Sequence, residues 1–238
     1  MDEYLRLLSY GPEGWGDELL HGAGVTFALA LATLPFGLAL GLAVALAARS
    51  RRLMWNRLAS LYTTVFRGVP ELLTLYIVYY GMQLGLQRVW RALALPGSVE
   101  INAFVAGMAA LGLVLAAFSS EVWLGALNAI PQGQRESTAA LGLRRGQAFR
   151  LVILPQLLRV ALPGLGNNWM VLLKETSLVS TIALADLMFM ASRATAVTKE
   201  PFLILGAAAL LYLVVSLAST GVLERLEARA NRPYGTRT

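Results

Sequence analysis

Two long stretches without a charged residue most limit the folds open to this chain. Residues 25–48 form one uncharged run and residues 202–222 form another. A helix needs about 20 apolar residues to cross the hydrocarbon core of a bilayer. The sequence is 57% hydrophobic with a mean hydropathy of +0.60, above the about 45–50% apolar content of soluble domains. These features predict a membrane protein and disfavour the alternative, a soluble protein with two buried core helices.

We predict an all-α integral membrane protein with a single transmembrane domain over residues 1–238. Five transmembrane helices are expected, at about 25–48, 61–82, 101–127, 158–184 and 202–222. In the first span, Pro35 is expected to bend the helix, and Gly37 and Gly41 to form a smooth face for a neighbouring helix. Residues 1–20 are acidic rather than basic, unlike a secretory signal, so we expect the first span to be retained as an anchor.

The orientation follows from the distribution of Lys and Arg among the loops, because cytoplasmic loops carry the excess. Thirteen arginines lie between spans one and two, between spans three and four, and after span five, whereas five basic residues lie on the opposite side. The amino terminus is therefore predicted outside, in the periplasm, and the carboxyl terminus in the cytoplasm. The loop 128–157 would then be cytoplasmic.

The sequence offers little for catalysis or for metal binding. It has no Cys, and its one His, His21, precedes the first span. Zinc sites and Ser-His or Cys-His catalysis therefore lack their usual ligand or base, which disfavours an intramembrane enzyme. The net charge of +6 does not indicate nucleic-acid binding, because the basic residues fall in alternate loops without interleaved aromatic residues.

The loop 128–157 is predicted to form two short helices joined at a glycine. Glu136 is expected in the first turn of the first helix, where a carboxylate favours the helix dipole. Gly142 suits the position after the helix end, which needs a positive φ. A second helix is expected over about 145–153, ended by Pro155. By pattern alone, an ordinary amphipathic surface helix is an equal alternative.

Ionisable residues inside the predicted spans are costly in a bilayer and are functional hypotheses by default. Arg67 and Glu71 are four residues apart and share a face if the helix is continuous. Pro70 lacks an N–H and loosens the helix there, and a broken helix would expose backbone to a cavity. Either the two charges neutralise each other, or Arg67 serves packing or a gate while Glu71 faces the pathway.

A second polar cluster lies in the fourth span and consists of Lys174, Glu175, Thr176 and Ser177. Successive helical side chains point about 100° apart, so Lys174 and Glu175 cannot both face one groove. The two hydroxyl residues are expected to bond either backbone or substrate. Asn167 and Asn168, near Pro163, are expected to satisfy loosened backbone groups.

Three segments resemble a known family. Residues 136–142 (Glu-Ser-Thr-Ala-Ala-Leu-Gly), followed by Ile153-Leu154-Pro155, resemble the coupling loop of permease subunits of ATP-binding-cassette (ABC) importers. Residues 62–71 (Tyr-Thr-Thr-Val-Phe-Arg-Gly-Val-Pro-Glu) and 162–178 resemble the second and fourth spans of polar amino acid permeases of the histidine/lysine/arginine/ornithine type, including opine permeases. The third span departs from the family's Glu-x-x-Arg-Gly: Glu121 is followed three residues later by Leu124, which removes the usual Arg partner.

The resemblance implies a permease subunit with the type I ABC importer fold, multi-pass in the bacterial inner membrane and without enzymatic activity. It implies an alternating-access pathway formed with a second permease subunit, which we expect to be a different chain. A periplasmic or lipid-anchored binding protein would deliver the substrate. ATP and Mg would bind a separate ATPase, since this sequence lacks a Gly-x-x-x-x-Gly-Lys-[Ser/Thr] loop. The residues expected to couple to that ATPase are Glu136, Ala139, Gly142, Arg144, Arg145 and Pro155.

An amino acid substrate needs a cation for its carboxylate and an anion for its ammonium group. Lys174 or a helix N-terminus could supply the first. Glu71, Glu121 or Glu175 could supply the second and also bind a basic side chain. We therefore expect an importer of basic amino acids or opines, with Thr176 and Ser177 also in the pathway. The alternatives are an ATP-independent secondary carrier or channel for small polar solutes, and a scaffold without substrate.

Overall fold

The computed structural model describes residues 2–11 and 14–231 and is all-α over them. Of the predicted basic residues, Arg232 and Arg237 and the side chain of Arg135 lie outside the described part. The helices are α1 (Asp2–Leu7), α2 (Gly16–Ala48), α3 (Leu53–Gly68), α4 (Glu71–Ala92), α5 (Ala103–Ala129), α6 (Gln132–Ala140), α7 (Arg145–Ala148), the π-helix η1 (Phe149–Ile153), α8 (Leu154–Glu175), the 3-10 helix η2 (Thr176–Ile182), α9 (Leu187–Thr198) and α10 (Pro201–Asn231).

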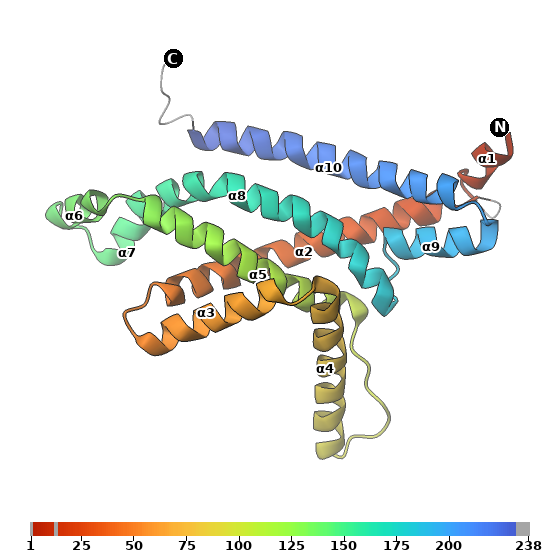
Figure 1. The fold of residues 1–238 in the computed structure, drawn as a ribbon, viewed down its shortest axis with the longest axis horizontal. Helices are drawn as coiled ribbons and strands as arrows, with labels where there is room; N and C mark the ends of the chain where they lie inside the picture. Colours follow the sequence, from red (N-terminus) through yellow and green to blue (C-terminus); the bar gives the residue numbers. More distant parts are fainter. Residues whose placement is uncertain (1, 12–13, 232–238) are drawn as a thin grey trace.

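Long helices form the body of the molecule. α2, α5, α8 and α10 run along its length, with α6 and α7 at one end and α1 and α9 at the other (Figure 1). Four described helical segments are long and apolar enough to cross a membrane: 16–48, 103–129, 145–182 and 201–231. They contain or overlap four of the five predicted spans. The first begins nine residues before the predicted start, and the last extends nine residues beyond the predicted end.

α2 packs closely against α5 because two glycines remove the side chains between them. A Cβ at Gly41 would lie 2.9 Å from the carbonyl oxygen of Ala116 and closer still to the Ser119 hydroxyl. A Cβ at Gly37 would lie within the side chain of Leu115. The hydroxyl of Ser119 donates to the carbonyl oxygen of Gly37 across the same contact. The smooth glycine face predicted from the sequence is confirmed.

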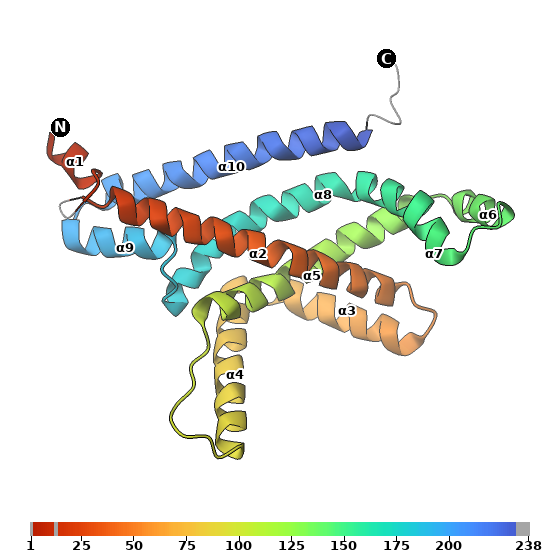
Figure 2. The same cartoon turned by 180° about the vertical axis from the view of Figure 1, so that it is seen from behind.

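The segment predicted as the second span is two helices. Val69 and Pro70 are extended between α3 and α4, and α4 then projects away from the long bundle, as both views show (Figures 1 and 2). The break at Pro70 was predicted, but the helices are longer than the predicted 61–82, since α3 begins at Leu53 and α4 reaches Ala92. Neither helix is among the four membrane-length segments, because α3 has only 16 residues and α4 carries several polar residues near its end.

The end of the bundle opposite α6 holds a buried carboxylate. Asp186 is fully buried and caps α9, since its Oδ1 accepts from the N–H of Phe189 at 2.9 Å. Its Oδ2 is buried and has no hydrogen-bond partner among the described residues. Burial raises the pKa of Asp186 to about 6. Asp186 lies directly before α9, in the part of the chain that connects the apolar helices α8 and α10.

Candidate functional site

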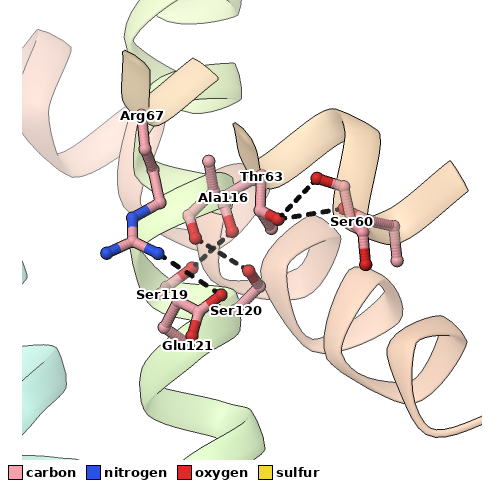
Figure 3. Close-up of polar contacts among 9 residues, drawn as sticks. Ser60, Thr63, Arg67, Ala116, Ser119, Ser120 and Glu121 are labelled. Carbon is pink, nitrogen blue, oxygen red and sulfur yellow. Dashed lines mark hydrogen bonds and ion pairs between the residues drawn. The ribbon is translucent and has the colours of Figure 1, made fainter. Parts of the chain in front are cut away.

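An ion pair joins α3 to α5 in the middle of the molecule. Arg67 Nη1 lies 3.4 Å from Glu121 Oε1 (Figure 3), and the same guanidinium lies 5.7 Å from the ring centroid of Phe118. The hydroxyl of Tyr62 donates to the carbonyl oxygen of Leu113 at 2.7 Å and holds the two helices together nearby. The pair is about half exposed in the isolated chain.

This pairing corrects two expectations. Arg67 and Glu71 do not share a helix face, because the extended residues at 69 and 70 place them on different helices. The hypothesis that Arg67 and Glu71 neutralise each other is therefore wrong. Glu121, which lacks the Arg expected three residues later, has a cationic partner in Arg67 instead. The sequence signal for this partner was present, since Arg67 and Glu121 are both ionisable residues within predicted spans, but their separation along the chain concealed it.

Two carboxylates from different helices approach each other where α4 begins and α8 ends. Glu71 is the first residue of α4, where its charge favours the helix dipole. Glu175 is the last residue of α8 and is half-buried. Both Glu71 and Lys174 interact electrostatically with Glu175. The structure thus brings together three of the residues predicted for the substrate pathway.

A cavity of about 160 Å³ adjoins this cluster between α5 and α8. A single water needs only about 10–15 Å³ by this measure, so the cavity has room for a small polar group with several waters. Its lining is mixed: Leu115, Phe118, Asn167, Asn168, Val171, Leu172 and Glu175. Asn168 Nδ2 is buried without a partner among the described residues. The expectation that Asn168 satisfies loosened backbone is therefore wrong, and a buried amide donor is left beside the cavity.

The other polar residues of this region are directed elsewhere. The hydroxyl of Thr176 is fully buried and donates to the carbonyl oxygen of Leu173 at 2.7 Å. The hydroxyl of Ser177 donates to the carbonyl oxygen of Lys174 at 2.7 Å. Both hydroxyls, at the start of η2, therefore bind backbone carbonyls in the last turn of α8 in this structure. Lys174 is exposed and is not among the residues that line the cavity.

The loop between α5 and α8 forms a compact knob of short helices. α6 ends in a Schellman motif, in which Leu143 N–H donates to Thr138 O and Gly142 N–H donates to Ala139 O. Gly142 has φ +71°, which confirms the predicted positive φ. Arg144 is the N-cap residue of α7, and its N–H donates to Gln147 Oε1 at 3.0 Å. The two short helices α6 and α7 are therefore joined by a turn that contains Gly142.

Other details of the knob differ from prediction. Glu136 is the fifth residue of α6 rather than in its first turn, because the helix already begins at Gln132, whose side-chain amide donates to Glu136 Oε1 at 2.8 Å. Pro155 does not end the second helix. It lies in the first turn of α8, where a missing N–H costs little, and the chain stays helical from α7 through η1 into α8.

The exposed surface of the knob carries most of the residues predicted to couple to an ATPase. Glu136, Ala139, Gly142, Arg144, Arg145 and Pro155 are all exposed. The loop joining α2 to α3 lies at the same end of the molecule, as does the carboxyl end of α10 (Figure 1). The arginine-rich segments of the sequence therefore gather at one end. Within the described residues, no group of three His, Asp or Glu side chains could hold a metal ion.

Membrane-length helices, an acidic cavity between α5 and α8 and an exposed polar knob at one end are the features of a membrane transport subunit that works with a partner protein. The sequence matches the family model of the binding-protein-dependent transport system inner membrane component over residues 21–232. The chain belongs to this family. It is therefore a multi-pass inner-membrane permease component of an ABC transporter, and such subunits are not catalytic.

Relatives of known function support the assignment over nearly the whole chain. The octopine transport system permease protein OccQ of Rhizobium meliloti is 39% identical over 229 residues, which cover 96% of this chain and 97% of the relative. The histidine/lysine/arginine/ornithine transport system permease protein HisQ of Escherichia coli K12 is 39% identical over 220 residues, or 91% of this chain and 94% of the relative. With these relatives, the chain is the permease component of an ABC importer of amino acids or opines, and the alternative hypothesis of an ATP-independent carrier or channel is wrong.

Solved structures show the same fold. The crystal structure of an amino acid ABC transporter with histidines contains a chain that superposes with a TM-score of 0.75 at 32% identity, covering 90% of this chain and 95% of that chain. An inward-facing MetNI methionine ABC transporter superposes with a TM-score of 0.70 at 19% identity, covering 89% and 95%. As an ABC permease, the chain implies ATPase partners and a binding protein.

Proposed function

We propose that this chain forms half of an importer pathway selective for basic amino acids or opines, and that Glu71 and Glu175 recognise the cationic side chain. The observation that carries the proposal is the cavity of about 160 Å³ lined by Glu175, with Glu71 close enough to interact with Glu175 electrostatically. Two carboxylates near a mixed cavity attract a guanidinium or ammonium group. A neutral side chain would leave that charge without a partner.

The remaining polar groups fit an amino acid. The unpartnered amide donor of Asn168 can bind a carboxylate or carbonyl oxygen. Lys174, one residue from Glu175, can supply a positive charge for the substrate carboxylate after a change of rotamer. Glu121 is already paired with Arg67, so we assign this pair to holding α3 against α5 beside the pathway. Thr176 and Ser177 shape the end of α8 through their backbone bonds.

The specificity is tested by ATPase activity of the whole transporter in proteoliposomes with its binding protein. We expect stimulation by arginine, lysine, histidine or an opine, and little by glutamine or glutamate. Glu175→Gln and Glu71→Gln should reduce stimulation by basic substrates while the basal ATPase activity and complex assembly persist. Normal stimulation of both variants by basic substrates would contradict the assignment.

We further propose that the knob docks on the separate ATPase, which binds ATP and Mg, through Glu136, Ala139, Gly142, Arg144 and Arg145, with Pro155 at the start of α8 behind them. The arginine-rich end is then cytoplasmic, and the end with α1 and α9 is periplasmic. α3 and α4 together serve as the fifth membrane-embedded segment. The exposed apolar side chains of α4, among them Ile77, Tyr80 and Leu84, support a second permease subunit as its neighbour, which we propose is a different chain.

A further inference from the structure

A second, larger cavity lies behind the knob. It measures about 700 Å³ and is formed where the ends of α2 and α5 meet α6, α7 and η1. Its lining is Leu46, Arg49, Arg51, Leu127, Thr138, Ala139, Leu143, Arg145, Ala148, Phe149 and Ile153. Three arginines and no carboxylate contribute to this lining. The cavity is distinct from the one that Glu175 lines.

The arginines and the apolar residues that line this cavity come from several parts of the sequence. Arg49 and Arg51 follow α2, and Arg145 begins α7. Leu46 and Leu127 belong to the apolar helices α2 and α5, so the cavity reaches the depth at which the predicted spans end. The chain fixes part of the charged rim, since Arg49 Nη1 donates to the carbonyl oxygen of Leu127 at 3.1 Å. Leu127 and Ile153 are almost fully buried beneath it.

We propose that this cavity binds the headgroup of an anionic phospholipid, with the phosphate at the three arginines and the glycerol and upper acyl chains against Leu46, Phe149 and Ile153. Basic cavities between transmembrane helices on the cytoplasmic side suit anionic headgroups. A water-soluble anion would gain nothing from the apolar part of the lining. A carboxylate of a partner protein would neutralise the rim but leave the apolar floor uncovered.

A bound lipid has a mechanical consequence for the knob. Its phosphate would connect Arg49 and Arg51, which follow α2, with Arg145 of α7. The knob would then be braced against the bundle, so that a push on α6 and α7 is passed to α2 and α5 rather than absorbed in the loop. This inference goes beyond the proposed substrate and would stand if the transported amino acid proved to be neutral.

Native mass spectrometry of the complete transporter tests the proposal. We would add phosphatidylglycerol or phosphatidylethanolamine at equal concentration, and inorganic phosphate in a third arm. The test variant is Arg49→Gln/Arg51→Gln/Arg145→Gln. Its control is Arg150→Gln/Arg225→Gln/Arg229→Gln, which removes three exposed arginines that do not line the cavity. We expect phosphatidylglycerol affinity to fall about 10- to 100-fold in the test variant only, since each basic residue near the membrane contributes to anionic-lipid attraction.

Three results would overturn the proposal. One is equal loss of phosphatidylglycerol in both triple variants. Another is arginine-dependent binding of inorganic phosphate without preference for phosphatidylglycerol over phosphatidylethanolamine, which would define a soluble-anion site. The third is loss of the ATPase from the test variant with lipid binding unchanged, which would assign the arginines to the ATPase. If the triple variant does not assemble, Arg49→Gln/Arg51→Gln, which leaves every proposed ATPase-docking residue unchanged, should weaken phosphatidylglycerol binding severalfold, and no change would count against the site.

Discussion

The glycine at the hinge of the knob gives the sharpest mutational prediction. Gly142 has φ +71°, and a Cβ there would meet nothing within 4 Å. Alanine at this position is therefore strained only by its backbone, at a cost of about 1–2 kcal/mol. Since 1.4 kcal/mol is a factor of ten in an equilibrium constant, we expect Gly142→Ala to lower the equilibrium constant that favours the observed hinge about 5- to 30-fold, and to reduce substrate-stimulated ATPase activity.

A series at Gly142 separates strain from charge. Asparagine tolerates a left-handed conformation better than alanine does, so Gly142→Asn should stay closer to the wild type. Gly142→Asp has a similar shape but adds a charge to the proposed docking surface, and we expect it to insert normally and to abolish transport. The assay is stimulated ATPase activity in proteoliposomes, normalised to the amount of ATPase that copurifies.

A matched control lies in the same knob. Gly133 is within α6 and has neither a positive φ nor any atom near an added Cβ, so Gly133→Ala should be neutral. The hinge reasoning is refuted if Gly142→Ala couples as well as the wild type. The docking reasoning is refuted if Gly142→Asp transports normally with the ATPase bound.

Three further predictions concern the rest of the fold. Gly41→Ala should destabilise the protein by about 1–3 kcal/mol through overpacking against α5, whereas Gly24→Ala in the same helix, where nothing lies within 4 Å, should not; equal thermal melting of the two variants would contradict the close contact. Arg67→Gln and Glu121→Gln should each lower thermal stability more than the double variant does, because a single change leaves an unpaired charge; additive losses would show that the pair is not coupled. The folded-state pKa of Asp186 is about 6, raised above its unfolded-state pKa. Asp186 should therefore contribute stability that is fully present below its unfolded-state pKa and is lost as the pH rises through about 6. Asp186→Asn should flatten this part of the profile of thermal stability against pH, and an unchanged profile would contradict the burial argument.

The features that the sequence predicted well are local ones. Two uncharged runs located the first and last of the four membrane-length segments, and mainly apolar runs located the other two, because the bilayer sets a length that composition alone can satisfy. The positive φ of Gly142 was predicted because the end of a short helix needs it. The break at Pro70 was expected since proline cannot continue the hydrogen bonding of a helix.

The features that it predicted poorly depend on contacts between distant segments. The pairing of Arg67 with Glu121 needs the direction in which the chain leaves Pro70, and helical spacing suggested Glu71 instead. Pro155 was read as a helix end, although proline suits a helix start equally well. The cavity beside Glu175 arises from the packing of α5 against α8, and no local pattern around Asn168 indicated that its amide would remain without a partner.

The most direct test of the central claim is substrate-stimulated ATPase activity of the complete transporter in proteoliposomes, compared between wild type and Glu175→Gln. We expect that arginine, lysine, histidine or an opine stimulates the wild type, and that the variant loses most of this stimulation while it still binds its ATPase. Stimulation by neutral or acidic amino acids alone, or equal stimulation of the variant by basic ones, would contradict the acidic recognition site.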